Sequence, residues 1–213
     1  MKIATIITTR SKSCHVKTLH AVLRINIKCL ERGLQNEISY VNDDPYEKAE
    51  VIQACIKNSE RVIFIDFGIG MDDDSIMQCL EKHEGVGCVV FPGAREGIDW
   101  GLFKHKVRND SSEPVHQMGL EFDTQIGKKI SDDMYTVDST SARCWTVNSK
   151  NILKNGKDKK TGNFKIAPRF EQMFAKWKES GVKIHAFTAA KLTMTYNHEC
   201  ISNILNAAGV SAN

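Results

Sequence analysis

Short apolar runs alternate with helical patterns over the first 91 residues, and this alternation constrains the fold more than any other feature. The runs at residues 2–8, 37–41, 61–65 and 86–91 predict strands, and helices are expected at about 16–32, 45–58 and 75–82. Apolar strands without period-two alternation are typical of a parallel sheet covered on both faces. We therefore expect an α/β domain whose central, mostly parallel sheet is flanked by helices and binds ligands beyond the carboxyl ends of its strands.

The ends of the first two helices can be predicted from capping residues. Gly33 is expected to stop the first helix, whose predicted buried face consists of Leu19, Val22, Leu23, Ile27 and Leu30. In the second helix Asp44 suits the N-cap, Pro45 the first helical position, and Glu47 completes a capping box. The later half is less regular, with a strand expected at 143–147, an aromatic helix at 169–180 and a strand at 182–187.

Composition indicates the number of domains in the chain and the cellular compartment that suits it. Its 213 residues suit one domain, and 29 basic against 26 acidic residues neither require nor exclude an anionic partner. The seven cysteines never form a CxxC pair, which argues against a disulfide framework or a zinc cluster and favours the cytoplasm. No segment approaches the roughly 18 apolar residues of a membrane span. The small, polar C-terminal residues are linker-like, so the chain is expected to belong to a longer protein.

Acidic residues follow the third predicted strand. Asp66 directly succeeds the apolar run Val62 to Ile65, where a carboxylate could hold a magnesium or manganese ion that bridges phosphates. Capping of the following turn is the equal alternative for Asp66. Asp72, Asp73 and Asp74 precede Ser75, and helix capping is the stronger interpretation for the last two.

The stretches RVIFIDFGIGMDDDSIMQCL and GCVVFPGAREGIDW resemble the nucleotide-sugar glycosyltransferases of the GT-A fold. Asp66 matches the first aspartate of their DxD motif, whereas Gly68 replaces the second. The resemblance implies a Rossmann-like domain over 1–213, with a nucleotide-binding half at 1–100 and an acceptor-binding half at 101–213. It also implies Mn²⁺ or Mg²⁺, a UDP-sugar donor, and a glycan or glycoprotein acceptor.

The same resemblance implies roles for individual residues. The nucleotide would contact residues at three strand ends and in the segment before Trp145, namely Thr8, Thr9, Arg10, Asn42, Asp43, Phe67 and Arg143. The stretch PRFEQMFAKWKESGVKIHAF aligns Glu171 with the family glutamate but places Gln172 where inverting members have their aspartate base. Glu171 or Asp138 would then join Asp66 as a catalytic residue, or the enzyme would retain configuration.

In the segment TMTYNHEC, His198 matches a family histidine near the metal, so Asp66, His198 and Asp72 are the expected ligands; a surface or capping role is the alternative for His198. Trp100 and Trp145 could form a platform for a sugar, although tryptophans more often pack in the core. The whole chain is also similar to the glycosyltransferases with which chlorella viruses decorate their capsids. That similarity implies a UDP-sugar donor and a glycan acceptor on a capsid protein. It agrees with the expectations of a cytoplasmic setting, here the host cytoplasm, of no membrane segment and of further linked domains.

Three other classes of protein are alternatives to a glycosyltransferase. A sugar-phosphate nucleotidyltransferase also presents acids at strand ends to a metal and a nucleotide. A dinucleotide-dependent oxidoreductase is disfavoured because the loop TTRSKSC lacks the glycines of a GxGxxG turn. A nucleic-acid-binding module would need basic residues clustered with aromatics, but only KNGKDKK is concentrated, so no nucleic-acid partner is expected.

Overall fold

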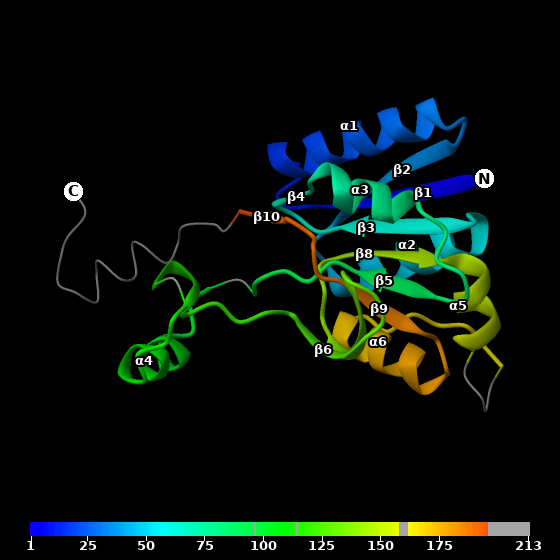
Figure 1. Ribbon diagram of the computed structural model, residues 1–213. Coiled ribbons are helices and arrows are strands. Elements are labelled where there is room, and N and C mark those ends of the chain that lie inside the picture. Colours follow the sequence, from blue (N-terminus) through cyan, green and yellow to red (C-terminus); the bar gives the residue numbers. More distant parts are fainter. Residues whose placement is uncertain (96, 114, 158–161, 196–213) are drawn as a thin grey trace. The chain divides into compact units, whose positions relative to one another are not determined.

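A computed structural model describes residues 1–95, 97–113, 115–157 and 162–195. The chain divides into two compact units, one comprising Met1–Gly93 and Asp123–Thr193 and the other Ala94–Phe122 and Met194–Asn213. The larger unit contains a mixed eight-stranded sheet, in the order β2-β1-β3-β8-β5-β9-β7-β6, with helices on both faces (Figure 1). The α/β class expected from the alternating pattern is therefore confirmed.

The parallel part of the sheet is built from the first strands of the chain. β1 (Lys2–Thr9) pairs in parallel with β2 (Gln35–Asn42) on one side and with β3 (Arg61–Ile65) on the other. β5 (Cys88–Val90) and β9 (Ile184–Phe187) are also parallel. The carboxyl ends of β2, β1 and β3 consequently lie together at one edge of the sheet.

Antiparallel strands complete the sheet. β8 (Cys144–Asn148) lies between β3 and β5 and runs against both. β7 (Met134–Thr140) is antiparallel to β9 and to the edge strand β6 (Thr124–Lys129). A separate two-stranded sheet joins the very short β4 (Ile69–Gly70) and β10 (Thr193–Met194). The sheet is thus parallel where nucleotide binding was expected and mixed beyond β3.

Helices cover the sheet from both sides. α2 (Pro45–Asn58), α5 (Ser149–Asn155) and α6 (Phe170–Glu179) share one core with Ala4, Ile6, Val62 and Phe64. The alternate residues of β1 and β3, which point the other way, are buried on the face covered by α1 (Val16–Glu31) and α3 (Asp73–Leu80). The smaller unit contains α4 (Trp100–Arg108) and a 3-10 turn at Val115–Gln117.

Two expectations about helices need correction. The buried face of α1 consists of Thr18, Ala21, Val22, Ile25 and Cys29, so the predicted face was wrong except at Val22. In α2, Asp44 caps the helix as expected by accepting from the backbone N–H groups of Tyr46 and Glu47. The carboxylate of Glu47, however, accepts from the side-chain amide of Asn42 instead of closing a capping box.

Candidate functional site

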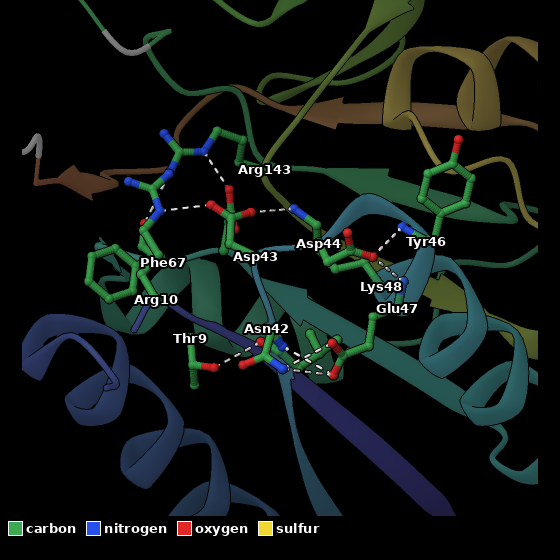
Figure 2. Close-up of polar contacts among 12 residues, drawn as sticks. Thr9, Arg10, Asn42, Asp43, Asp44, Tyr46, Glu47, Lys48, Phe67 and Arg143 are labelled. Carbon is green, nitrogen blue, oxygen red and sulfur yellow. Dashed lines mark hydrogen bonds and ion pairs between the residues drawn. The ribbon is translucent and has the colours of Figure 1, made fainter. Parts of the chain in front are cut away.

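The carboxyl ends of β1 and β2 are joined by a cluster of charges around Asp43. One oxygen of Asp43 accepts from Arg10 Nε at 2.8 Å and the other from Lys48 Nζ at 2.7 Å, so the two cations flank one carboxylate (Figure 2). Burial alone would raise the pKa of Asp43, but the hydrogen bonds and charges of Lys48 and Arg10 outweigh it and lower the pKa. Asp43 thereby holds Arg10 and Lys48 at the edge of the sheet.

Thr8, Thr9 and Asn42 lie at the same strand ends. The hydroxyl of Thr9 donates to the carbonyl oxygen of Val41 at 3.1 Å, which ties β1 to β2. Thr8 is fully buried, and its hydroxyl has no hydrogen-bond partner among the described residues. Asn42 is held by Glu47 at 3.0 Å. Thr8, Thr9 and Asn42 therefore lie at the same edge of the sheet as Arg10 and Asp43, and their role in nucleotide binding stays a prediction.

At the end of β3, Asp66 forms an ion pair with Arg143. Arg143 Nε donates to Asp66 Oδ2 at 2.7 Å, its Nη2 donates to the carbonyl oxygen of Phe67 at 3.0 Å, and both side chains are largely buried. The backbone N–H of Asp66 donates to the carbonyl oxygen of Arg143 at 3.0 Å, so the two residues are joined through side chain and main chain. The other carboxylate oxygen, Asp66 Oδ1, is buried without a partner within the described residues.

Phe67 links the two arginines. The guanidinium carbon of Arg10 lies 5.1 Å from the centre of the Phe67 ring, whose edge contact with His15 spans 5.5 Å between centroids. Arg143 bonds the backbone carbonyl oxygen of the same residue. Two guanidinium groups, one from the residue after β1 and one from the residue before β8, are thus oriented around one strand end, an arrangement suited to an anion.

Asp123 is a residue that the sequence analysis missed. It is 4% exposed, its Oδ1 accepts from the backbone N–H of Gly93 and the hydroxyl of Thr124, and its Oδ2 has no partner in the described part of the chain. Burial raises the pKa of Asp123, against opposing bonds from Thr124 and Gly93 and the backbone N–H and charge of Arg143. No sequence signal marked it, because it precedes the polar strand β6 instead of following an apolar one.

The residues expected as metal ligands stay predictions, and those that the structure describes lie in different surroundings. Asp72 is the N-cap of α3 and accepts from the backbone N–H and the hydroxyl of Ser75, so its carboxylate already serves the helix. Asp73 pairs with Arg24, and His198 lies outside the described residues. Within the described ranges no group of three or more histidine, cysteine or acidic residues is placed to hold a metal ion. Among the described residues, Asp66 Oδ1 is the one expected ligand atom that is buried without a hydrogen-bond partner, which fits a cation also held by phosphate oxygens and water.

The second DxD position has a conformational reason to differ. Gly68 has a φ of +79°, a left-handed conformation that residues with a Cβ rarely adopt. An aspartate would be strained at this point of the turn between β3 and β4. The backbone conformation of this turn therefore favours glycine over a second aspartate after β3.

Glu171 and Asp138 lie together, but not among the strand-end residues described above. Both line a surface cavity of about 290 Å³ between β7 and α6. Lys178 donates from Nζ to the carbonyl oxygen of Asp138 at 2.7 Å, and lies 4.0 Å from its carboxylate.

Trp145 is fully buried, and its ring stacks on that of Phe64 with 5.1 Å between the ring centroids. The interpretation of Trp145 as a platform for a sugar was therefore wrong. Trp100, in the smaller unit, is 49% exposed.

Comparisons with protein-family models and with curated proteins give no sequence match. Among solved structures, GalNAc-T7 in complex with UDP, GalNAc and Mn²⁺ is similar over 92% of this chain and 44% of its own, with a TM-score of 0.51 and 10% identity. The fold resembles that of the GT-A glycosyltransferases. This chain thus spans less than half the length of that enzyme.

Two further structures are similar at lower scores. A mutant Drosophila β-1,4-galactosyltransferase 7, in complex with manganese, UDP-Gal and xylobiose, aligns over 94% of this chain and 73% of its own, with a TM-score of 0.49 and 11% identity. The inositol-1-phosphate CTP transferase of T. maritima aligns over 98% of this chain and 79% of its own, with a TM-score of 0.39 and 8% identity. No helix in the described ranges has the length and apolar character to cross a membrane.

Proposed function

We propose that this chain is a glycosyltransferase that moves a sugar from a UDP-sugar donor to a hydroxyl group of a glycan or glycoprotein. One observation carries the proposal: the buried pair of Asp66 and Arg143 lies beside Arg10 at the carboxyl end of β3, and one oxygen of its carboxylate has no hydrogen-bond partner in the part of the chain that the structure describes. In an open α/β sheet this edge is where nucleotides bind.

The arginines suit the diphosphate of the donor. A guanidinium has five N–H donors, and Arg143 uses two of them on Asp66 and Phe67, leaving three for a ligand in the described structure. Arg10 is oriented by Asp43 and by the Phe67 ring. Both groups would bind phosphate oxygens and stabilise the negative charge that grows on the departing UDP.

A divalent cation, Mn²⁺ or Mg²⁺, would be held by Asp66 Oδ1 together with diphosphate oxygens and water, and when bound would neutralise further phosphate charge. In the transfer itself, the bond from the anomeric carbon to the phosphate oxygen breaks and UDP leaves with the electron pair. The acceptor oxygen bonds to that carbon and loses its proton to a carboxylate. In an inverting enzyme this carboxylate would be Glu171 or Asp138, which line one cavity; the alternative is an enzyme that retains configuration.

The finer expectations rest on the sequence alone. A viral capsid protein as acceptor, the host cytoplasm, further linked domains and the halves at 1–100 and 101–213 stay predictions. No described contact bears on the alternative nucleic-acid-binding role.

Titration calorimetry with UDP, in the presence and absence of Mn²⁺, tests donor binding. We expect the wild-type chain to bind UDP, and Asp66→Asn to reduce both Mn²⁺-dependent affinity and UDP release from UDP-sugars by roughly tenfold or more. The control is Asp132→Asn, since the Asp132 carboxylate is 98% exposed and lies in the turn between β6 and β7. Absence of UDP binding would refute the proposal, and pyrophosphate release from UTP and a sugar phosphate would assign the nucleotidyltransferase class instead.

A further inference from the structure

The outer face of α1 carries a stripe of exposed apolar side chains. The exposed fractions are 70% for Val16, 37% for Leu19, 51% for Leu23, 53% for Ile27 and 70% for Leu30. The opposite face of the same helix is buried against the sheet. A surface helix normally exposes polar residues, so a helix that is apolar on both faces indicates a surface that another molecule covers.

The residues of the stripe have the same sequence spacing whether the helix is read from its N-terminus or from its C-terminus. Its intervals are three, four, four and three residues, with Leu23 at the centre. If a second copy of the helix packs antiparallel about a two-fold axis at Leu23, Val16 of one copy lies opposite Leu30 of the other. Leu19 then lies opposite Ile27, and the two Leu23 side chains meet. This self-complementarity is what an isologous interface requires.

Charges on one flank of the stripe are complementary in the same arrangement. Lys17 and Glu31 are 14 residues apart, nearly four turns, and therefore lie on the same side of α1. Lys17 precedes Leu23 by six residues and Glu31 follows it by eight, which corresponds to about 9 and 12 Å along the axis. The two-fold axis would place Lys17 of each copy beside Glu31 of the other, with an offset of roughly 3 Å along the helix axis.

The remaining charges near the stripe argue against an anionic lipid surface as the occupant. Arg24 pairs with Asp73, and Arg32 lies 3.7 Å from Glu81. Lys28 pairs with Glu31 on its own helix at 2.8 Å. Lys17 is the one cation of α1 for which the described structure shows no ion pair. A membrane-binding helix needs an excess of unpaired basic residues around its apolar face, and α1 has its charges largely balanced.

We propose that this stripe of α1 is the interface of a homodimer in which two copies of the helix pack antiparallel about Leu23. Apolar contacts form its centre, and two reciprocal ion pairs between Lys17 and Glu31 fix its register. The inference does not depend on the glycosyltransferase function.

Sedimentation equilibrium of the 213-residue chain over a concentration series tests the proposal. We expect a monomer–dimer equilibrium whose dissociation constant rises roughly tenfold or more in Leu23→Glu, because the substitution places two carboxylates at the two-fold axis. Ile130→Glu is the matched control, since Ile130 is 48% exposed and lies outside α1, and it should leave the constant unchanged. Equal melting temperatures of the two variants would exclude unfolding as the cause.

A charge exchange tests the register. Lys17→Glu and Glu31→Lys should each weaken the dimer by roughly two- to tenfold, and the double variant should recover most of the loss. Only an antiparallel pairing of these two residues predicts that recovery. A wild-type chain that is monomeric throughout overturns the proposal, as does a dimer insensitive to Leu23→Glu. Binding of the monomer to phosphatidylserine-containing vesicles, lost in Leu23→Glu, would assign the stripe to lipid and also overturn it.

Discussion

Replacing Arg143 with methionine should destabilise the chain strongly at neutral pH. The substitution keeps an aliphatic side chain of similar reach but removes the guanidinium that bonds Asp66 and the carbonyl oxygen of Phe67. The Asp66 side chain is only 9% exposed, and one of its oxygens already has no partner among the described residues. Breaking a buried pair by removing one member leaves an uncompensated charge, which costs about 3–5 kcal/mol.

The magnitude can be measured by urea denaturation followed by circular dichroism. At the lower end, about 3 kcal/mol corresponds to a fall in melting temperature of roughly 6–12 °C for a chain of this size. The double variant Asp66→Asn/Arg143→Met has no buried charge at this position and should recover a large part of the loss. If Arg143→Met changes the free energy of unfolding by less than about 0.5 kcal/mol, the reasoning about a buried, mutually dependent pair is refuted.

Two other predictions concern neighbouring strand ends. The pKa of Asp43 is lowered in the folded state, so its ionised form contributes stability that is present above the unfolded value of about 3.9 and is lost as the pH falls through the folded pKa. Asp43→Asn should therefore lower the free energy of unfolding by about 1 kcal/mol at pH 7, with the difference disappearing in acid; a difference independent of pH would contradict the assignment. Gly68→Asp, which restores the second DxD aspartate, should cost about 1 kcal/mol or more because φ is positive there, whereas unchanged stability would show that the turn relaxes.

The sequence was informative where local patterns determine structure. Short runs rich in apolar residues predicted β1, β2, β3 and β5, and capping chemistry placed the start of α2 at Pro45. β6 and β7 were missed because their polar and apolar residues do not form a clear pattern: β6 reads TQIGKK, and only one of its residues is buried. The wrong face of α1 has a related cause. Periodicity identifies an apolar stripe but does not reveal whether a sheet or another molecule covers it.

The sequence predicted several residues of the candidate site but not the ion pair between Asp66 and Arg143. Strand-end positions identified Asp43, Asp66 and Arg10 without tertiary information. The partner of Asp66 comes from 77 residues later in the chain, and a long-range antiparallel contact of this kind has no local sequence signal. Asp72 is the N-cap of α3, a role that its position immediately before the helix favours, and its assignment to a metal stays a prediction.

The antiparallel insertion of β8 has a consequence for how the chain can be divided. All five residues of β3 are buried, and β8 covers the side of β3 opposite β1. A fragment ending before β8 would therefore expose β3 as an apolar edge strand with unpaired backbone groups, a surface that promotes aggregation. Completion of the sheet around β1, β2 and β3 thus depends on a segment that is synthesised after residue 140.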